Sequence, residues 1–194
     1  MGFKYLLKDG IVVVAAVGLF GCGGDPVGPQ WSGEIQALIT DIPAPGSAFT
    51  GTMSANASVS VSTDSTTWVE LGSASAVSVV LQSATDTTNV YGAKIITGDE
   101  YSYVRLSLSN AVVLVNSGST FGNVTLVGDR NIILGGADSA LVVDLMVAPF
   151  VVNDSTPAVL EFDLNSQAYI NRAALLAGVV DDATGVGAVV VVVN

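Results

Sequence analysis

Hydrophobic and polar residues alternate along much of the chain after residue 30. The clearest segment is 101–109, where Val104, Leu106 and Leu108 are separated by polar residues. Such alternation is typical of a strand with one face in a hydrophobic core. It predicts further strands at 35–39, 57–61, 67–71, 77–81, 111–115, 123–127, 131–134, 141–147 and 159–164.

Turn-forming residues separate these segments. Examples are 41–46, 63–66, 85–88 and 135–138, which are rich in Asp, Gly, Pro, Ser and Thr. Turns at intervals of about 8–12 residues predict an all-β sandwich or barrel. We expect one helical turn, around Asn171–Leu176.

The first 21 residues have a different pattern. Lys4 and Lys8 precede an apolar run at 11–20, and the small residue Gly21 follows. This order is typical of a signal peptide. Because a membrane-spanning helix needs about 20 apolar residues, the run is too short for a stable transmembrane segment.

Cys22 is the only cysteine, so it cannot form an internal disulfide. The segment Leu19-Phe20-Gly21-Cys22 resembles the lipobox of bacterial lipoproteins, although Phe20 is larger than the residue usual there. This resemblance implies cleavage before Cys22 and attachment of palmitate-type acyl chains, and two or more chains anchor a protein stably. The alternative is an ordinary signal peptide with an incidental cysteine.

Residues 22–30 are rich in Gly and Pro and predict a flexible tether to a single domain at 31–194. The residue after Cys22 is Gly23, whereas the inner-membrane retention signal of enterobacterial lipoproteins has Asp there. We therefore expect a lipid-anchored protein of the cell envelope, at the outer membrane, on its periplasmic or its surface face.

Charge and composition narrow the functional classes. The precursor has a net charge of −11, and loss of residues 1–21 leaves four basic and sixteen acidic side chains. Nucleic acids and anionic lipids bind Lys/Arg clusters, so nucleic-acid binding is excluded. The chain has no histidine, which removes the commonest general base and zinc ligand. We expect no enzymatic activity and no cofactor other than the covalent lipid.

The strand at 101–109 offers one candidate ligand face. Tyr101, Tyr103 and Arg105 alternate with the apolar positions, and Tyr and Arg are common at binding hot spots. The favoured alternative is that Arg105 forms a cross-strand ion pair with Asp163 or another strand carboxylate.

Two aromatic residues could stack on sugar rings, which makes carbohydrate binding a second candidate function. They are Trp31 and Trp68, and we expect Trp68 to lie in the core instead.

Several aspartates in or beside turns are candidate calcium ligands, because calcium takes oxygen ligands. They are Asp129, Asp138 and Asp144, together with Asp181 and Asp182. None has the spacing of a known calcium loop, so the favoured alternative is that they cap turns and contact solvent.

Glu161 and Asp163 share one face of a strand, as a carboxylate pair for sugar hydrolysis would. Any strand with a polar outer face has the same pattern, so we do not expect catalysis.

The segment Val189–Val193 is entirely apolar and β-branched. An exposed strand of this kind promotes aggregation. It should therefore be a buried strand, or a strand that pairs with another chain as in a polymerising fimbrial subunit.

Five segments together resemble a family of bacterial lipoprotein domains of unknown function. They are Thr40-Asp41-Ile42-Pro43, the hairpin Val59-Ser60-Val61-Ser62 with Trp68-Val69-Glu70-Leu71, the Gly98–Leu106 segment with its Tyr and Arg-Leu, Leu160-Glu161-Phe162-Asp163, and 179–185. Ile42 and Glu161 depart from the family pattern. The resemblance implies a β-sandwich of the transthyretin or immunoglobulin type and supplies no activity. The overall expectation is a lipid-anchored structural or binding module, with a fimbrial subunit and a carbohydrate-binding module as alternatives.

Overall fold

The computed structural model describes residues 32–43, 48–97, 100–135, 140–152, 158–180 and 191–193. The chain divides into two units, Met1–Gln30 and Trp31–Asn194. The predicted signal peptide, Cys22 and the tether belong to the first unit and lie outside the described residues.

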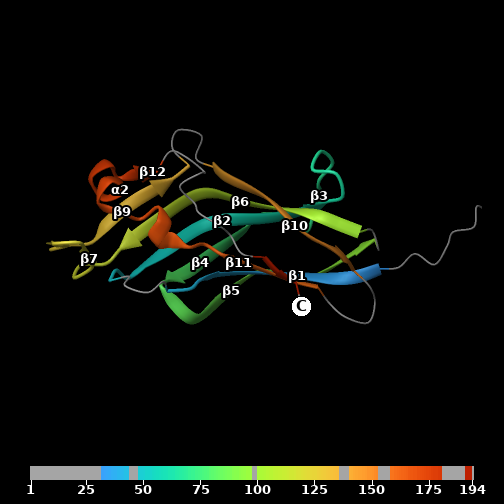
Figure 1. Cartoon of the computed structure of the whole chain (residues 1–194), viewed down its shortest axis with the longest axis horizontal. Helices are drawn as coiled ribbons and strands as arrows, with labels where there is room; N and C mark the ends of the chain where they lie inside the picture. The colour runs from blue at the N-terminus through green and yellow to red at the C-terminus, as the bar shows by residue number, and fades with distance from the viewer. Residues whose placement is uncertain are drawn as a thin grey trace, which may run out of the picture. The chain divides into compact units, whose positions relative to one another are not determined.

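The second unit is mostly β-sheet, with one short α-helix among the described residues (Figure 1). Its elements in chain order are β1(Ser32–Asp41), β2(Gly51–Ser62), β3(Val69–Glu70), β4(Ser75–Leu81), β5(Ser83–Thr97), β6(Glu100–Val115), β7(Thr120–Phe121), β8(Val124–Thr125), β9(Arg130–Leu134), β10(Ala140–Val151), β11(Ala158–Asp163), η2(Ser166–Ala168), α2(Arg172–Ala177), β12(Val179–Val180) and β13(Val191–Val193).

The described strands form two larger sheets and one hairpin. The smaller of the two sheets has the order β13-β11-β1-β5. The other has the order β12-β9-β6-β2-β3, with β10 also paired to β6 and β4 to β2. Strands β7 and β8 form the hairpin. Both larger sheets are mixed, because β1 pairs with β11 and β12 with β9 in parallel.

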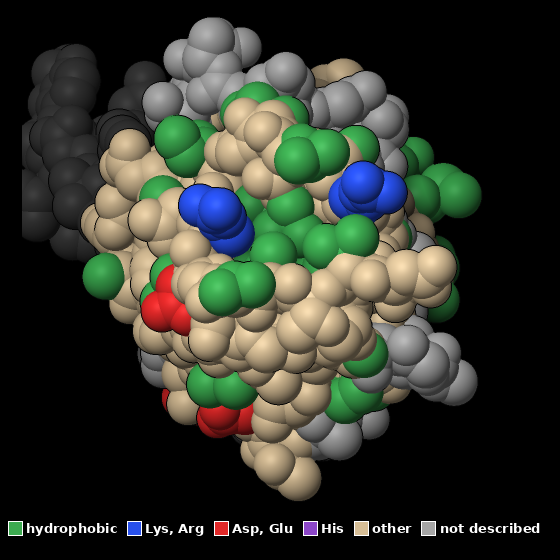
Figure 2. Space-filling view, turned by 90° about the vertical axis from the view of Figure 1, so that its left-hand side faces the viewer, with side chains coloured by type: hydrophobic (Ala, Val, Ile, Leu, Met, Phe, Trp, Pro, Cys, Tyr) green, Lys and Arg blue, Asp and Glu red, His purple; other side chains and the backbone are tan. Residues whose placement is uncertain are grey.

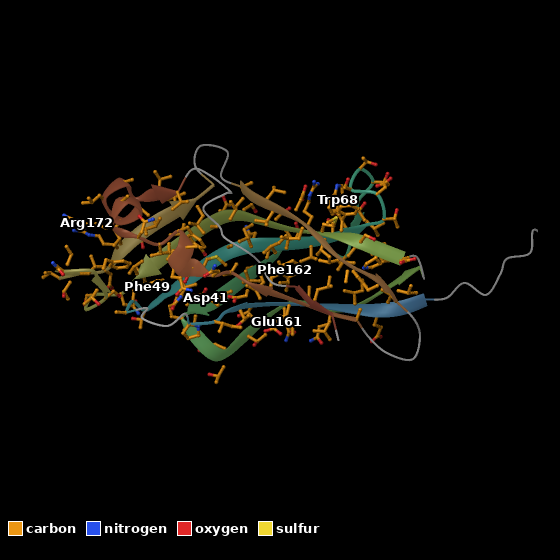
Figure 3. All side chains as sticks on the ribbon, in the orientation of Figure 1. Asp41, Phe49, Trp68, Glu161, Phe162 and Arg172 are labelled. Carbon is orange, nitrogen blue, oxygen red and sulfur yellow. The ribbon has the colours of Figure 1, made fainter. Side chains whose placement is uncertain are left out.

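The two larger sheets contribute to one hydrophobic core. Ile39 and Phe162 from the smaller sheet and Val59 and Leu106 from the larger one are fully buried in the same cluster. Phe162 points between the sheets, whereas its neighbour Glu161 points away from them (Figure 3). Full burial of such an apolar side chain contributes about 1.5–3 kcal/mol. The predicted alternation at Val104, Leu106 and Leu108 is thus confirmed, since all three are buried.

A sharp corner connects the two sheets at Gln82. This residue lies between β4 of one sheet and β5 of the other, and its φ is 57°. Its backbone N–H donates to Asp41 Oδ2 over 2.7 Å. Asp41 is fully buried, and its Oδ1 also accepts from Ser166 N at 2.7 Å. One carboxylate therefore joins the end of β1, the corner and η2.

The structure corrects two sequence predictions of strand ends. The polar segment 85–88, predicted as a turn, lies inside β5, where Thr88 Oγ1 donates to the backbone oxygen of Ser78 in β4. The predicted strands 101–109 and 111–115 form one strand, β6, which passes through Asn110 at φ 52°. The predicted helical turn at 171–176 is confirmed as α2.

Candidate functional site

The predicted ligand face of Tyr101, Tyr103 and Arg105 does not form. Tyr101 is 1% exposed and packs in the core, with its ring centroid 5.9 Å from that of Phe150. The alternation changes phase between Tyr101 and Val104, opposite a register irregularity between Met146 and Phe150 in β10. Tyr101 therefore points inward, and only Tyr103 and Arg105 lie on the outer side.

Arg105 forms the predicted cross-strand ion pair, but its partner is Asp144 of β10 and not Asp163. The two residues lie directly opposite each other in the sheet. Arg105 Nε and Nη2 donate to the two oxygens of Asp144 over 2.6 and 2.7 Å. This bidentate contact lowers the pKa of the Asp144 carboxyl and raises the pKa of the guanidinium.

The sequence predicted that Trp68 lies in the core, and this prediction is wrong. The side chain is half-buried and lies over the ion pair. Its ring centroid is 4.1 Å from Cζ of Arg105. A guanidinium over an indole face is a favourable cation–π contact. One face of the ring is thus covered by Arg105, which leaves less of it for a sugar. Trp31 lies outside the described residues.

The predicted calcium ligands have other partners or are not described. Asp144 binds Arg105, and Asp129 accepts a hydrogen bond from Ser117 N at 2.8 Å, which fits its alternative role as a turn cap. Asp138, Asp181 and Asp182 lie outside the described residues. Among the residues that the structure describes, no group of three or more His, Cys, Asp or Glu side chains could hold a metal ion.

The predicted carboxylate pair consists of Glu161 and Asp163 on β11. Asp163 Oδ1 accepts hydrogen bonds from the backbone N–H groups of Ile42 and Asn165, both at 3.1 Å. Asp163 therefore holds the loops that follow β1 and β11.

In the apolar C-terminal segment, Val191–Val193 forms β13 and pairs antiparallel with β11 of the same chain. The rest of that segment lies outside the described residues.

A pocket lies beside β7, η2 and α2, where the sequence predicted no site. Its volume is about 420 Å³. Figure 2 views the domain from the end where β7 and α2 lie, and shows apolar side chains gathered in a hollow with basic side chains on either side. Its lining consists of Ala48, Phe49, Thr120, Phe121, Gly122, Gln167, Ile170, Asn171 and Arg172.

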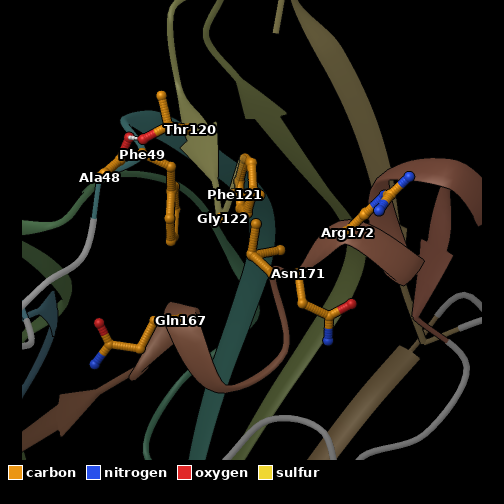
Figure 4. Close-up of a pocket in the computed structure, with 9 residues that line it drawn as sticks. Ala48, Phe49, Thr120, Phe121, Gly122, Gln167, Asn171 and Arg172 are labelled. Atoms are coloured by element: carbon orange, nitrogen blue, oxygen red, sulfur yellow. Dashed lines mark hydrogen bonds between the residues drawn. The ribbon is translucent and has the colours of Figure 1, made fainter. Parts of the chain in front are cut away.

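Two phenylalanines form the apolar wall of this pocket (Figure 4). The rings of Phe49 and Phe121 stack with centroids 5.5 Å apart. The backbone fixes their positions, because Thr120 N donates to Ala48 O over 2.9 Å and Thr50 N donates to Ser119 Oγ over 3.1 Å. The wall is thus attached to the strands and does not depend on side-chain packing alone.

The opposite side of the pocket comes from η2 and α2. Asn171 caps α2, with its Oδ1 accepting from Ala173 N and Ala174 N over 2.9 and 3.0 Å. The next residue, Arg172, is exposed at the rim. No hydrogen bond or ion pair to the Arg172 side chain occurs within the described part of the chain.

Buried polar groups hold η2 in place beneath the pocket. Ser166 donates to Asp41 through both its backbone N–H and its hydroxyl. Tyr169 is 2% exposed, and its burial, with the nearby carboxylates of Asp41 and Asp163, raises the pKa of its hydroxyl well above the usual value. The phenol therefore stays neutral. The contacts of Ser166 with Asp41 and the burial of Tyr169 anchor in the core the segment that carries the rim.

The comparisons with known proteins give no relative. No protein-family model, curated protein or solved structure matches the chain. The comparisons therefore identify no family. The structure itself shows a mostly-β protein with several sheets, of which the two larger ones are mixed. Within the described residues, no helix has the length and apolar character to cross a membrane.

Proposed function

We propose that this chain is a lipid-anchored domain of the bacterial cell envelope that binds a small ligand through the pocket beside β7 and α2. The observation that carries the proposal is the pocket itself, with its stacked phenylalanines and donor groups. Pockets of about 300–1,000 Å³ with an apolar lining and a few placed polar groups are typical ligand sites.

The surroundings of three described carboxylates support binding rather than catalysis. Asp41, Asp144 and Asp163 accept structural hydrogen bonds from the backbone or from Arg105, at 2.6–3.1 Å. A general acid or base needs a carboxyl within hydrogen-bond reach of its substrate. None of the described residues that line the pocket is acidic.

The anchoring part of the proposal rests on the sequence. The lysines and apolar run before Cys22, and the Gly- and Pro-rich segment after it, support cleavage, lipidation and a tethered domain. The finer fold assignment, a sandwich of the transthyretin or immunoglobulin type as in the lipoprotein family that the sequence resembles, is also a proposal. The core shared by the two larger sheets supports it.

Binding is tested by purifying the protein from the membranes of its host and identifying small molecules released on denaturation. The variant Ala48→Trp places a large side chain at the pocket wall, and Ala148→Trp, at an exposed position on β10, is the control. We expect one compound to accompany the wild type and Ala148→Trp and to be absent from Ala48→Trp. No compound in the wild type, or equal amounts in all three proteins, would contradict the proposal.

Lipidation is tested separately with Cys22→Ser. We expect the wild type to fractionate with membranes and this variant to lose its acyl chains and remain uncleaved. Cleavage and membrane retention that do not depend on Cys22 would support the alternative of an ordinary signal peptide.

A further inference from the structure

Charge distinguishes the pocket from the rest of the chain. The protein carries seventeen acidic residues against six basic ones. None of the nine described lining residues is acidic, and one of them, Arg172, is a cation. The pocket is thus a locally positive site on a strongly negative protein.

Arg172 differs from Arg105 in its surroundings. Arg105 is neutralised by a bidentate contact with Asp144, at 2.6 and 2.7 Å, and its guanidinium lies over Trp68. In the part of the chain that the structure describes, the Arg172 side chain has no such partner. A guanidinium presents several N–H donors in a plane that fits a carboxylate.

Asn171 adds a second donor beside Arg172. Its Oδ1 accepts two backbone N–H groups of α2, and these contacts fix the orientation of the amide. The amide nitrogen, a donor only, is then the group that remains for a ligand. Asn171 and Arg172 therefore present donors side by side at the rim, which suit an anionic acceptor.

The shape of the pocket sets the rest of the ligand. The wall opposite the rim consists of Phe49 and Phe121. Ile170, in the segment between η2 and α2, adds a further apolar side chain to the lining. In a volume of about 420 Å³ this wall suits a compact apolar group, and aromatic rings pack well against other rings.

We infer that the pocket binds a small organic carboxylate, with its apolar body against Phe49 and Phe121 and its carboxylate at Arg172. This inference rests on the proposed function and names the ligand class of the same site. A neutral sugar would use the same cavity without needing the Arg172 charge, so the two ligand classes predict different effects of removing that charge.

The test uses phenylacetate and its neutral analogue phenylacetamide as probes. Both are titrated calorimetrically into the full lipidated protein in detergent, with empty micelles as the blank. We expect the Kd of phenylacetate to be lower by about tenfold or more, since a carboxylate–guanidinium contact is among the strong hydrogen bonds. Equal affinities, or no heat from phenylacetate at millimolar concentration, would overturn the inference.

Two variants assign the effect to the pocket. Arg172→Gln should raise the Kd of phenylacetate about tenfold and abolish the preference over the amide. Arg105→Gln removes an arginine of β6, which is paired with Asp144 and lies outside the lining, and should change the Kd less than about twofold. Unchanged binding in Arg172→Gln, or equal losses in both variants, would overturn the inference.

The outcomes for ligand class and for the proposed function can be separated. If the host protein carries a neutral compound that Ala48→Trp excludes, the pocket is a binding site and the carboxylate inference is wrong. If the host protein carries no compound, the proposed function itself fails.

Discussion

At the scale of single residues, the carboxylates of this chain differ in what surrounds them. Asp41 is fully buried and connects three separate segments, whereas the side chain of Asp144 is 50% exposed and binds one arginine. A buried acceptor that satisfies several donors contributes more to stability than an exposed ion pair does. We therefore expect loss of the Asp41 carboxylate to lower the stability of the domain strongly, and loss of the Asp144 carboxylate to lower it only slightly.

Asp41→Ala should strongly destabilise the domain. The substitution leaves the backbone N–H groups of Ser166 and Gln82 without their acceptor in a buried place. We expect the free energy of unfolding to fall by about 3 kcal/mol or more, measured by urea denaturation. Asp129→Ala removes one exposed hydrogen bond and should cost less than about 1 kcal/mol. Similar losses in the two variants would contradict the role assigned to Asp41.

Asp144→Asn should have a small effect that depends on pH. Because Arg105 lowers the pKa of Asp144 in the folded state, the pair stabilises the protein above the ordinary carboxyl pKa. That contribution is lost as the pH falls through the lowered folded-state pKa. Both side chains are partly exposed, so we expect a loss of less than about 1 kcal/mol at pH 7. Denaturation of the wild type and the variant at pH 7 and at acid pH measures it, and a difference that grows on acidification would contradict the assignment.

At the scale of elements, period-2 alternation located most of the larger strands and missed those whose sequence is polar. Strand β5 contains Asp86, Thr87 and Thr88, which read as a turn, yet it pairs with β1 across the sheet. Its partner strand and not its own composition decides its conformation. The helical turn could be predicted because Asn171 is a good cap and Gly178, at φ 71°, ends the helix.

The pocket could not be predicted for a related reason. Phe49 and Phe121 are far apart in the sequence and meet only because β7 is held against residues 48–50. Neither residue belongs to a motif, and Arg172 reads as an ordinary helix residue. Tyr101 shows the converse error: a local pattern placed it outward, and a change of phase in the strand placed it in the core.

Substitutions of Asn110 test the left-handed backbone conformation at this point of β6. The φ of Asn110, 52°, lies in the left-handed region, and its side chain is exposed. Asn110→Val should destabilise the domain by about 1–2 kcal/mol, because a β-branched residue is strained in that region. Asn110→Gly should stay within about 0.5 kcal/mol of the wild type, because glycine adopts this conformation freely. Equal stability of the two variants in thermal denaturation would contradict this conformation.

Deletion of residues 191–194 tests whether β13 belongs to its own domain. The strand pairs with Leu160–Phe162 of β11, so its loss exposes that edge. We expect the free energy of unfolding to fall by about 1–3 kcal/mol, with deletion of residue 194 alone as the control. A truncated protein of unchanged stability that no longer forms homopolymers present in the wild type would instead support the fimbrial alternative.

At the scale of the whole molecule, a negative protein presents a pocket whose described lining contains Arg172 and no acidic residue, on a segment anchored in its core. Asp41, Ser166 and the buried Tyr169 hold η2, and the hairpin of β7 and β8 holds the opposite wall. A site supported in this way is largely pre-formed, which lowers the entropic cost of binding. Attachment through Cys22 would keep this domain at the membrane.

The most direct test of this account is native mass spectrometry of the protein extracted in mild detergent from its own host. The account predicts a monomer that begins at Cys22, carries the mass of attached acyl chains, and releases one small compound on denaturation. A ladder of homopolymers, or an unmodified chain without a bound compound, would contradict it.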